Sequence, residues 1–191
     1  MLSYHNDFSV KEKFQLRFEA HRAADEVIQG TGFDNGRGCF VGCTLDNYDH
    51  SQFPIQLGWP EWLARLADAI FEGIPKSEAP QFGTDLLAAV PVGKDLEPVR
   101  HMIAIRRHER QLMLLQGNVE PYAEQCRSAL NKVIQYLKKS IVGFESNSAD
   151  SAARSAAYSA ARSAAYSARS AARSAEYQIE RDTLLEILTS L

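Results

Sequence analysis

Apolar residues recur at steps of three and four along most of this chain, which is the period of an amphipathic helix. Ser9 and Glu12 form a capping box at the start of the first such pattern, and Gly30 follows its end. The pattern predicts helices over 9–30, 60–73, 81–89, 95–115 and 121–143. We therefore expect an all-α fold in which residues 1–143 form a helical globular domain.

A repeat replaces this pattern near residue 148. From there the chain reads as near-copies of a four-residue unit of alanine, serine and either arginine or tyrosine, and it closes on an apolar stretch up to Leu191. Alanine is the strongest helix former, and 148–189 contains neither glycine nor proline. We expect one continuous helix there, about 60 Å long. Residues 144–191 are thus predicted to form a second unit, a long helix with an apolar C-terminal anchor.

The predicted rod is the basis of the leading functional hypothesis. Its alanine and serine side chains are small enough for another backbone to approach closely, and the rod is longer than a small domain is wide. We expect an interaction or assembly protein that forms a homo-oligomer, or binds a protein partner, through this helix. The predicted interaction face alternates arginine with tyrosine: Arg154, Tyr158, Arg162, Tyr166, Arg169, Arg173 and Tyr177. Such a row also permits binding of nucleic acid or a nucleotide, which is the less favoured hypothesis.

Residues 30–38 form a glycine-rich segment with four glycines, read Gly-Thr-Gly-Phe-Asp-Asn-Gly-Arg-Gly. This composition predicts a loop whose backbone has unusual torsion angles or approaches another group closely. The lysine of a phosphate-binding loop is absent, so we discount that function. The apolar run 39–45 that follows is compatible with a buried strand or with a turn of helix.

Five side chains in this region have the chemistry of a functional site: His21, Asp25, Cys39, Cys43 and His50. Thiols and imidazoles are ligands of zinc and other transition metals. We therefore treat His21, Cys39, Cys43 and His50 as candidate metal ligands and zinc, or another transition metal, as the candidate cofactor. On the predicted first helix His21 and Asp25 share one face with apolar residues, so each needs a polar partner.

Two alternatives to a metal site remain open. In the first, Cys39 is a nucleophile activated by His21 or His50, with Asp25 orienting the imidazole. In the second, the cysteines pack as small apolar side chains, and His21 and Asp25 form a satisfied buried pair. The pattern does not decide whether the chain is an enzyme.

Composition narrows the classes of function further. The net charge of -3 gives no overall field that would draw the chain to nucleic acid or to an acidic membrane. The odd number of cysteines, three, argues against a disulfide scaffold and for a reducing compartment. No stretch approaches the roughly 20 apolar residues of a membrane span, and the N-terminus lacks the pattern of a signal peptide. We expect a cytoplasmic protein that does not bind membranes.

The chain carries four short motifs ahead of its alanine-rich tail: Tyr4-His5-Asn6, the run Gly-Arg-Gly-Cys-Phe-Val-Gly-Cys-Thr over 36–44, Leu57-Gly58-Trp59-Pro60 and Ile70-Phe71-Glu72-Gly73. Together they resemble a family of bacterial and phage hypothetical proteins of uncharacterised function. The resemblance covers most of the chain. It implies a bacterial or phage setting, but it implies no activity, ligand or functional residue.

Overall fold

The computed structural model describes residues 1–117, 121–141 and 172–191. These residues are mainly α-helical, which confirms the predicted all-α class, and the strands among them form one short hairpin. They fall into two compact units. The first unit contains Met1–Glu97 together with Ala172–Leu191, and the second begins at Pro98.

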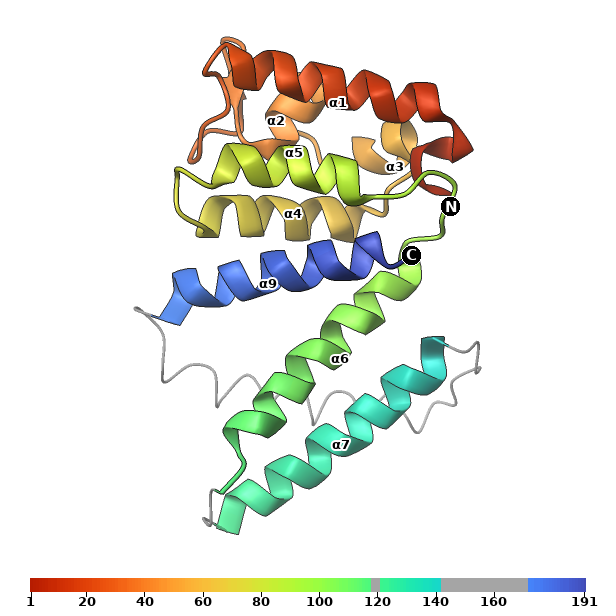
Figure 1. Cartoon of the computed structure of the whole chain (residues 1–191), viewed down its shortest axis with the longest axis vertical. Coiled ribbons are helices and arrows are strands. Elements are labelled where there is room, and N and C mark those ends of the chain that lie inside the picture. The colour runs from red at the N-terminus through yellow and green to blue at the C-terminus, as the bar shows by residue number, and fades with distance from the viewer. Residues whose placement is uncertain (118–120, 142–171) are drawn as a thin grey trace. The chain divides into compact units, whose positions relative to one another are not determined.

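The first unit is built from helices that are distant in sequence. Its elements are η1 Ser3–Asn6, α1 Phe8–Ala23, β1 Phe33–Asp34, β2 Arg37–Gly38, α2 Phe40–Leu45, α3 Gln52–Leu57, α4 Glu61–Gly73, α5 Ala79–Ala89 and α9 Ala172–Thr189. Helix α1 packs against α2 and α5, and α9 packs against α4 and α5 (Figure 1). The two strands pair in antiparallel register, with Phe33 opposite Gly38.

Aromatic side chains form the centre of this unit. Phe40, Phe53 and Trp59 are fully buried, with ring centroids 6.1 Å apart for Phe40 and Phe53 and 5.8 Å apart for Phe53 and Trp59. Burial of a large apolar side chain contributes about 1.5–3 kcal/mol. These contacts join α2 and α3 to Trp59, which lies two residues before the start of α4. They therefore hold together the elements that surround the candidate site.

Helix α1 is shorter than the sequence pattern predicts. Its N-cap is Asp7, whose carboxylate accepts a hydrogen bond of 2.8 Å from the backbone N–H of Ser9. The helix ends at Ala23, and Asp25 has a left-handed backbone with φ of 57°, which a right-handed helix cannot accommodate. The chain then turns so that Ile28 donates its N–H to the Gly38 carbonyl oxygen at 2.8 Å. The prediction of a helix over 9–30 is therefore wrong beyond Ala23.

The apolar end of helix α9 is buried in the first unit. Leu184, Ile187 and Leu188 are buried, and Arg181 forms an ion pair with Glu78 just before α5. The C-terminal part of the segment that we predicted as a separate unit, 144–191, is thus an integral part of the first unit. The rest of the predicted rod, up to residue 171, lies outside the described residues.

The described part of the second unit contains α6 and α7. Helix α6 spans Glu97–Leu114 and α7 spans Pro121–Ile141, in agreement with the helices predicted over 95–115 and 121–143. Arg127 on α7 donates to the carbonyl oxygen of Leu115 at 3.0 Å. Among the helices that the structure describes, none combines the length and the apolar character needed to cross a membrane.

Candidate metal centre

Three side chains that can each offer a ligand atom to a metal converge in the first unit: Cys39, Asp68 and Glu72. The Cys39 Sγ and one carboxylate oxygen from each of the other two residues all lie within 4.8 Å of one another. Asp68 and Glu72 are one turn apart on α4 and so project from the same face, while Cys39 immediately precedes α2. Cys39 is 1% exposed and Asp68 8% exposed, and Glu72 reaches the surface.

The glycine-rich segment positions Cys39. The Cys39 N–H donates to the carbonyl oxygens of Thr31 and Gly32, at 2.8 and 3.1 Å. A Cβ atom at Gly38 or at Gly42 would overlap the Gly32 carbonyl oxygen, so both positions require glycine if the loop is to lie against the start of α2. The close approach predicted for this segment is therefore an approach to the chain's own backbone.

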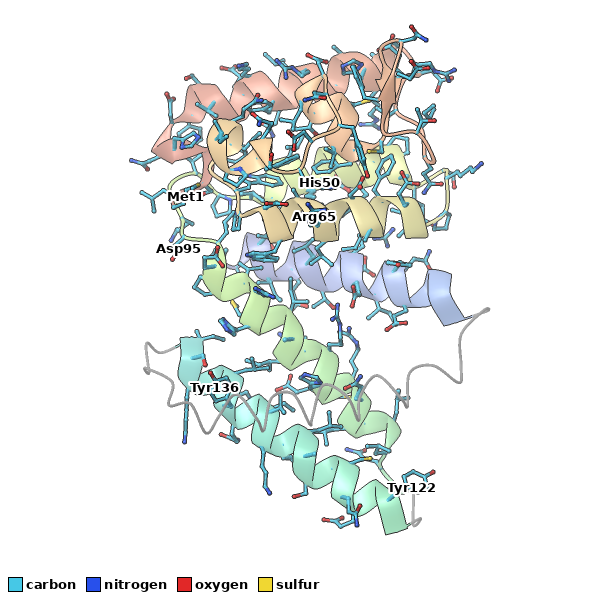
Figure 2. All side chains as sticks on the ribbon, turned by 180° about the vertical axis from the view of Figure 1, so that it is seen from behind. Met1, His50, Arg65, Asp95, Tyr122 and Tyr136 are labelled. Atoms are coloured by element: carbon cyan, nitrogen blue, oxygen red, sulfur yellow. The ribbon has the colours of Figure 1, made fainter. Side chains whose placement is uncertain are left out.

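Tyr48 and His50 both bond to the same oxygen of Asp68. Its Oδ2 accepts a hydrogen bond of 3.0 Å from the Tyr48 hydroxyl and lies 3.1 Å from His50 Nε2. His50 lies over α4, the helix that carries Asp68 (Figure 2). The other oxygen, Oδ1, is buried and has no hydrogen-bond partner in the part of the chain that the structure describes. Leaving such a group unsatisfied costs about 1–3 kcal/mol, so Oδ1 is suited to bind a ligand from outside the chain.

Negative charge is unfavourable at this centre. Burial raises the pKa of the Cys39 thiol well above its ordinary range; the backbone of Gly42 opposes this rise, and the charge of Asp68 and a hydrogen bond with it add to the rise. Burial also raises the pKa of Glu72; the Gly30 N–H, which donates to Glu72 Oε2 at 2.8 Å, opposes this rise, and Asp68 adds to it. Burial and the Asp68 carboxylate raise the pKa of Tyr48 to about 12. A bound cation would oppose all three shifts, because it stabilises the deprotonated forms.

A second cluster of charged groups surrounds His21. His21 Nδ1 lies 2.6 Å from Glu26 Oε2, and Nε2 lies 2.8 Å from Asp46 Oδ1. Arg17 forms an ion pair with the other oxygen of Asp46 at 3.1 Å. Burial acts to lower the pKa of His21, but the hydrogen bonds and charges of Asp46 and Glu26 outweigh it and raise that pKa. Both ring nitrogens of His21 are occupied, so the cluster joins the end of α1 to the end of α2.

The structure separates the five residues singled out in the sequence. Cys39 and His50 both lie at Asp68. His21 contacts Glu26 and Asp46, whereas Asp25 is exposed in the turn after α1. The Cys43 thiol is buried, and it donates to the Gly38 carbonyl oxygen at 3.3 Å. Burial raises the pKa of Cys43 to about 11, as expected for a packed thiol.

Sequence reasoning missed Tyr48, Asp68 and Glu72. One signal for Asp68 was present, because Ala64 and Phe71, four residues before it and three after it, are both fully buried on α4. The helical period therefore places an acidic residue on the apolar face of the predicted helix, where it needs a partner. Tyr48 lies between α2 and α3, and we find no sequence pattern that singles it out.

The predicted interaction face lies largely outside the described residues. Arg154, Tyr158, Arg162, Tyr166 and Arg169 belong to that part of the chain, and the side chain of Arg173 does too. Tyr177 is described, and its ring packs so closely on Gly73 that a Cβ there would overlap it. At least this member of the face contributes to the first unit itself. Assembly through the repeat therefore stays a prediction.

Comparison of the chain with protein-family models, with curated proteins and with solved structures found no match. The resemblance to bacterial and phage proteins therefore stays a prediction.

Proposed function

We propose that this chain binds a divalent transition-metal ion of the zinc class through Cys39, Asp68 and Glu72 and acts as a metal-dependent enzyme. The observation that carries the proposal is the buried, unpartnered Oδ1 of Asp68 beside two further ligand atoms within 4.8 Å. Tyr48 and His50 occupy only Oδ2, so they fix the carboxylate and leave Oδ1 for an ion. Such outer-shell hydrogen bonds to a ligating carboxylate are typical of metal sites.

The ligand types favour zinc or a similar ion over calcium and magnesium. Calcium and magnesium bind oxygen ligands almost exclusively, whereas a thiolate together with carboxylates suits zinc and its neighbours among the transition metals. An ion would also offset the charge of the two carboxylates and of the thiolate that forms on binding. In the described part of the chain, the basic side chain that contacts these groups is His50, which pairs with Asp68.

The same surroundings argue against the alternative in which Cys39 is a free nucleophile. A nucleophilic cysteine has a lowered pKa and sits near positive charge. Burial and the Asp68 charge instead raise the pKa of Cys39, which keeps the metal-free thiol protonated. A cation bound at the centre reverses this preference, because a coordinating thiol is deprotonated.

Three protein ligands favour a catalytic over a structural role. Structural zinc sites have four protein ligands, while catalytic sites have three and leave one position for water or substrate. A bound ion would supply Lewis-acid chemistry there. The chain's own contribution is to hold Asp68 by two hydrogen bonds and to place Cys39 through the glycine loop.

Metal uptake by the untagged full-length protein tests this proposal. Each variant is equilibrated with Zn²⁺, separated from free ion and assayed by elemental analysis, and the Co²⁺ form is examined for thiolate-to-cobalt absorption. We expect one ion per chain for the wild type and for Cys43→Ser, which alters another buried thiol only one turn from Cys39. Cys39→Ser and Glu72→Gln should bind about a hundredfold more weakly, since loss of an outer-shell partner alone costs roughly 10–100-fold.

The thiol control makes the result decisive. Cobalt absorption that persists in Cys39→Ser but disappears in Cys43→Ser would place the ion elsewhere. A wild-type protein that retains no ion at all would overturn the proposal.

A further inference from the structure

Tyr48 covers the candidate metal centre from the loop between α2 and α3. Its hydroxyl donates to Asp68 Oδ2 at 3.0 Å, and its ring meets the His50 ring edge-on with centroids 5.1 Å apart. The Tyr48 ring also contacts the glycine-rich loop. A Cβ atom built on Gly32 would lie 2.6 Å from Tyr48 Cγ. The ring therefore lies against Gly32, whose carbonyl oxygen accepts a hydrogen bond from the Cys39 N–H.

Exposure distinguishes Tyr48 from the groups beneath it. Tyr48 is 49% exposed, whereas Cys39 is 1% and Asp68 8% exposed. Its hydroxyl lies at Asp68, and burial together with the charges of Asp68 and Glu72 raises the pKa of Tyr48. It is thus a side chain with one end in solvent and the other at the buried ligands.

We infer that Tyr48 is the gate of this centre, a side chain that must leave Asp68 and Gly32 before an ion can reach or leave Cys39 and Asp68. The inference rests on the proposed function and concerns access of solvent to the ligands. Loss of the Tyr48 hydrogen bond also weakens equilibrium binding, so alkylation of the metal-free thiol is the rate that isolates the gate. The gate is held shut by the hydrogen bond to Asp68 and by the contact of the ring with Gly32. A hydrogen bond to a charged group corresponds to about a tenfold to a hundredfold change in an equilibrium constant.

Three variants alter the gate and retain all three proposed ligands. Tyr48→Ala removes the cover, Tyr48→Phe removes only its hydrogen bond, and Gly32→Ala places a methyl group where the ring now lies. The double variant Gly32→Ala/Tyr48→Ala removes the steric conflict again. The matched control is Tyr122→Ala, which removes a tyrosine of similar exposure, 56%, from α7 in the second unit.

Two rates are measured in native conditions. The first is the loss of Zn²⁺ from the loaded protein to excess chelator. The second is the rate at which iodoacetamide alkylates Cys39 in the metal-free protein. Cys43 and Cys126 are replaced by serine in all variants, so that Cys39 is the remaining thiol that can react. Tyr48→Ala should accelerate both rates about tenfold or more, Tyr48→Phe less, and Tyr122→Ala not at all.

The outcomes separate the gate from the metal site. If the wild type takes up no ion, the proposed function fails, and the alkylation rate still tests the gate. If the ion binds but Tyr48→Ala leaves both rates at the wild-type level, the gate is overturned and the metal site stands. Gly32→Ala should behave like Tyr48→Ala, and a double variant that exchanges no faster than Tyr48→Ala alone would show that Gly32→Ala acts through the ring.

Discussion

Asp68→Asn is the sharpest test of the metal hypothesis, because asparagine has the shape of aspartate without its charge. In the metal-free protein two effects oppose each other. Hydrogen bonds to a charged group contribute about 1.5–3 kcal/mol and neutral ones about 0.5–1.5 kcal/mol, so the bonds from Tyr48 and His50 weaken by about 2 kcal/mol in total. Removing a buried charge whose Oδ1 has no partner, together with its repulsion of Glu72, returns about 1–3 kcal/mol. The free energy of unfolding should therefore change by no more than about 1 kcal/mol.

The large effect is expected only with metal. At a free Zn²⁺ concentration one hundred times the wild-type Kd, binding stabilises the native state by about 2.7 kcal/mol. For a chain of this size 1 kcal/mol shifts Tm by about 2–4 °C, so the wild type should gain about 5–11 °C. If Asp68→Asn binds a hundredfold more weakly, the same concentration adds only about 0.4 kcal/mol, or about 1–2 °C.

Thermal unfolding followed by circular dichroism, with and without Zn²⁺, measures both quantities. Asp46→Asn is the matched control, since it removes a carboxylate that contacts His21 rather than the proposed ligands. It should lower Tm in both conditions and retain the full metal-dependent gain. An Asp68→Asn protein that also retains the full gain would refute the reasoning, because Asp68 would then not bind the ion.

Three further substitutions test other parts of the first unit by urea unfolding. The folded-state pKa of His21 is raised, so its stabilisation is complete below the unfolded-state value of about 6.5 and is lost as pH rises through the folded-state value. His21→Gln should therefore cost about 1 kcal/mol in mildly acidic buffer and less at alkaline pH. A difference in stability between wild type and variant that grows as pH rises would contradict the raised pKa of His21. Gly73→Ala forces a methyl group into the ring of Tyr177 and should cost about 1–3 kcal/mol, part of which Tyr177→Ala should restore. Leu184→Ala should cost about 2–5 kcal/mol, and a negligible loss would mean that α9 does not pack on this unit in solution.

The helices were predictable because their apolar residues repeat with the helical period, and the end of α1 was not. Phe14 and Phe18 are both buried in α1, as the pattern predicts. The pattern continues through Asp25 to Ile28, yet the helix stops at Ala23 because Asp25 adopts a left-handed backbone. That conformation is stabilised by pairing of the following residues with Gly38, a contact across ten residues or more that periodicity does not contain.

The candidate centre was half predictable for a related reason. Cys39 and His50 stood out by chemistry alone, since thiols and imidazoles are ligand types wherever they occur. Asp68 and Glu72 lie 29 and 33 residues after Cys39, on α4, and only folding brings that helix to the start of α2. Sequence spacing instead grouped Cys39 with Cys43 and His21, which are near in the chain but bond to other groups.

The energetics of α4 give the strongest reason to regard Asp68 as functional. Position 68 lies between Ala64 and Phe71 on the buried face, where an apolar side chain would pack without any unsatisfied polar atom. An aspartate there incurs the desolvation of a carboxylate, leaves Oδ1 without a partner and raises the pKa of two neighbouring acids. Tyr48 and His50 offset part of this cost at Oδ2 and none of it at Oδ1. A purely structural Asp68 would thus gain only the two hydrogen bonds at Oδ2, whereas an ion bound at Oδ1 would also offset the desolvation, the missing partner and the raised pKa values.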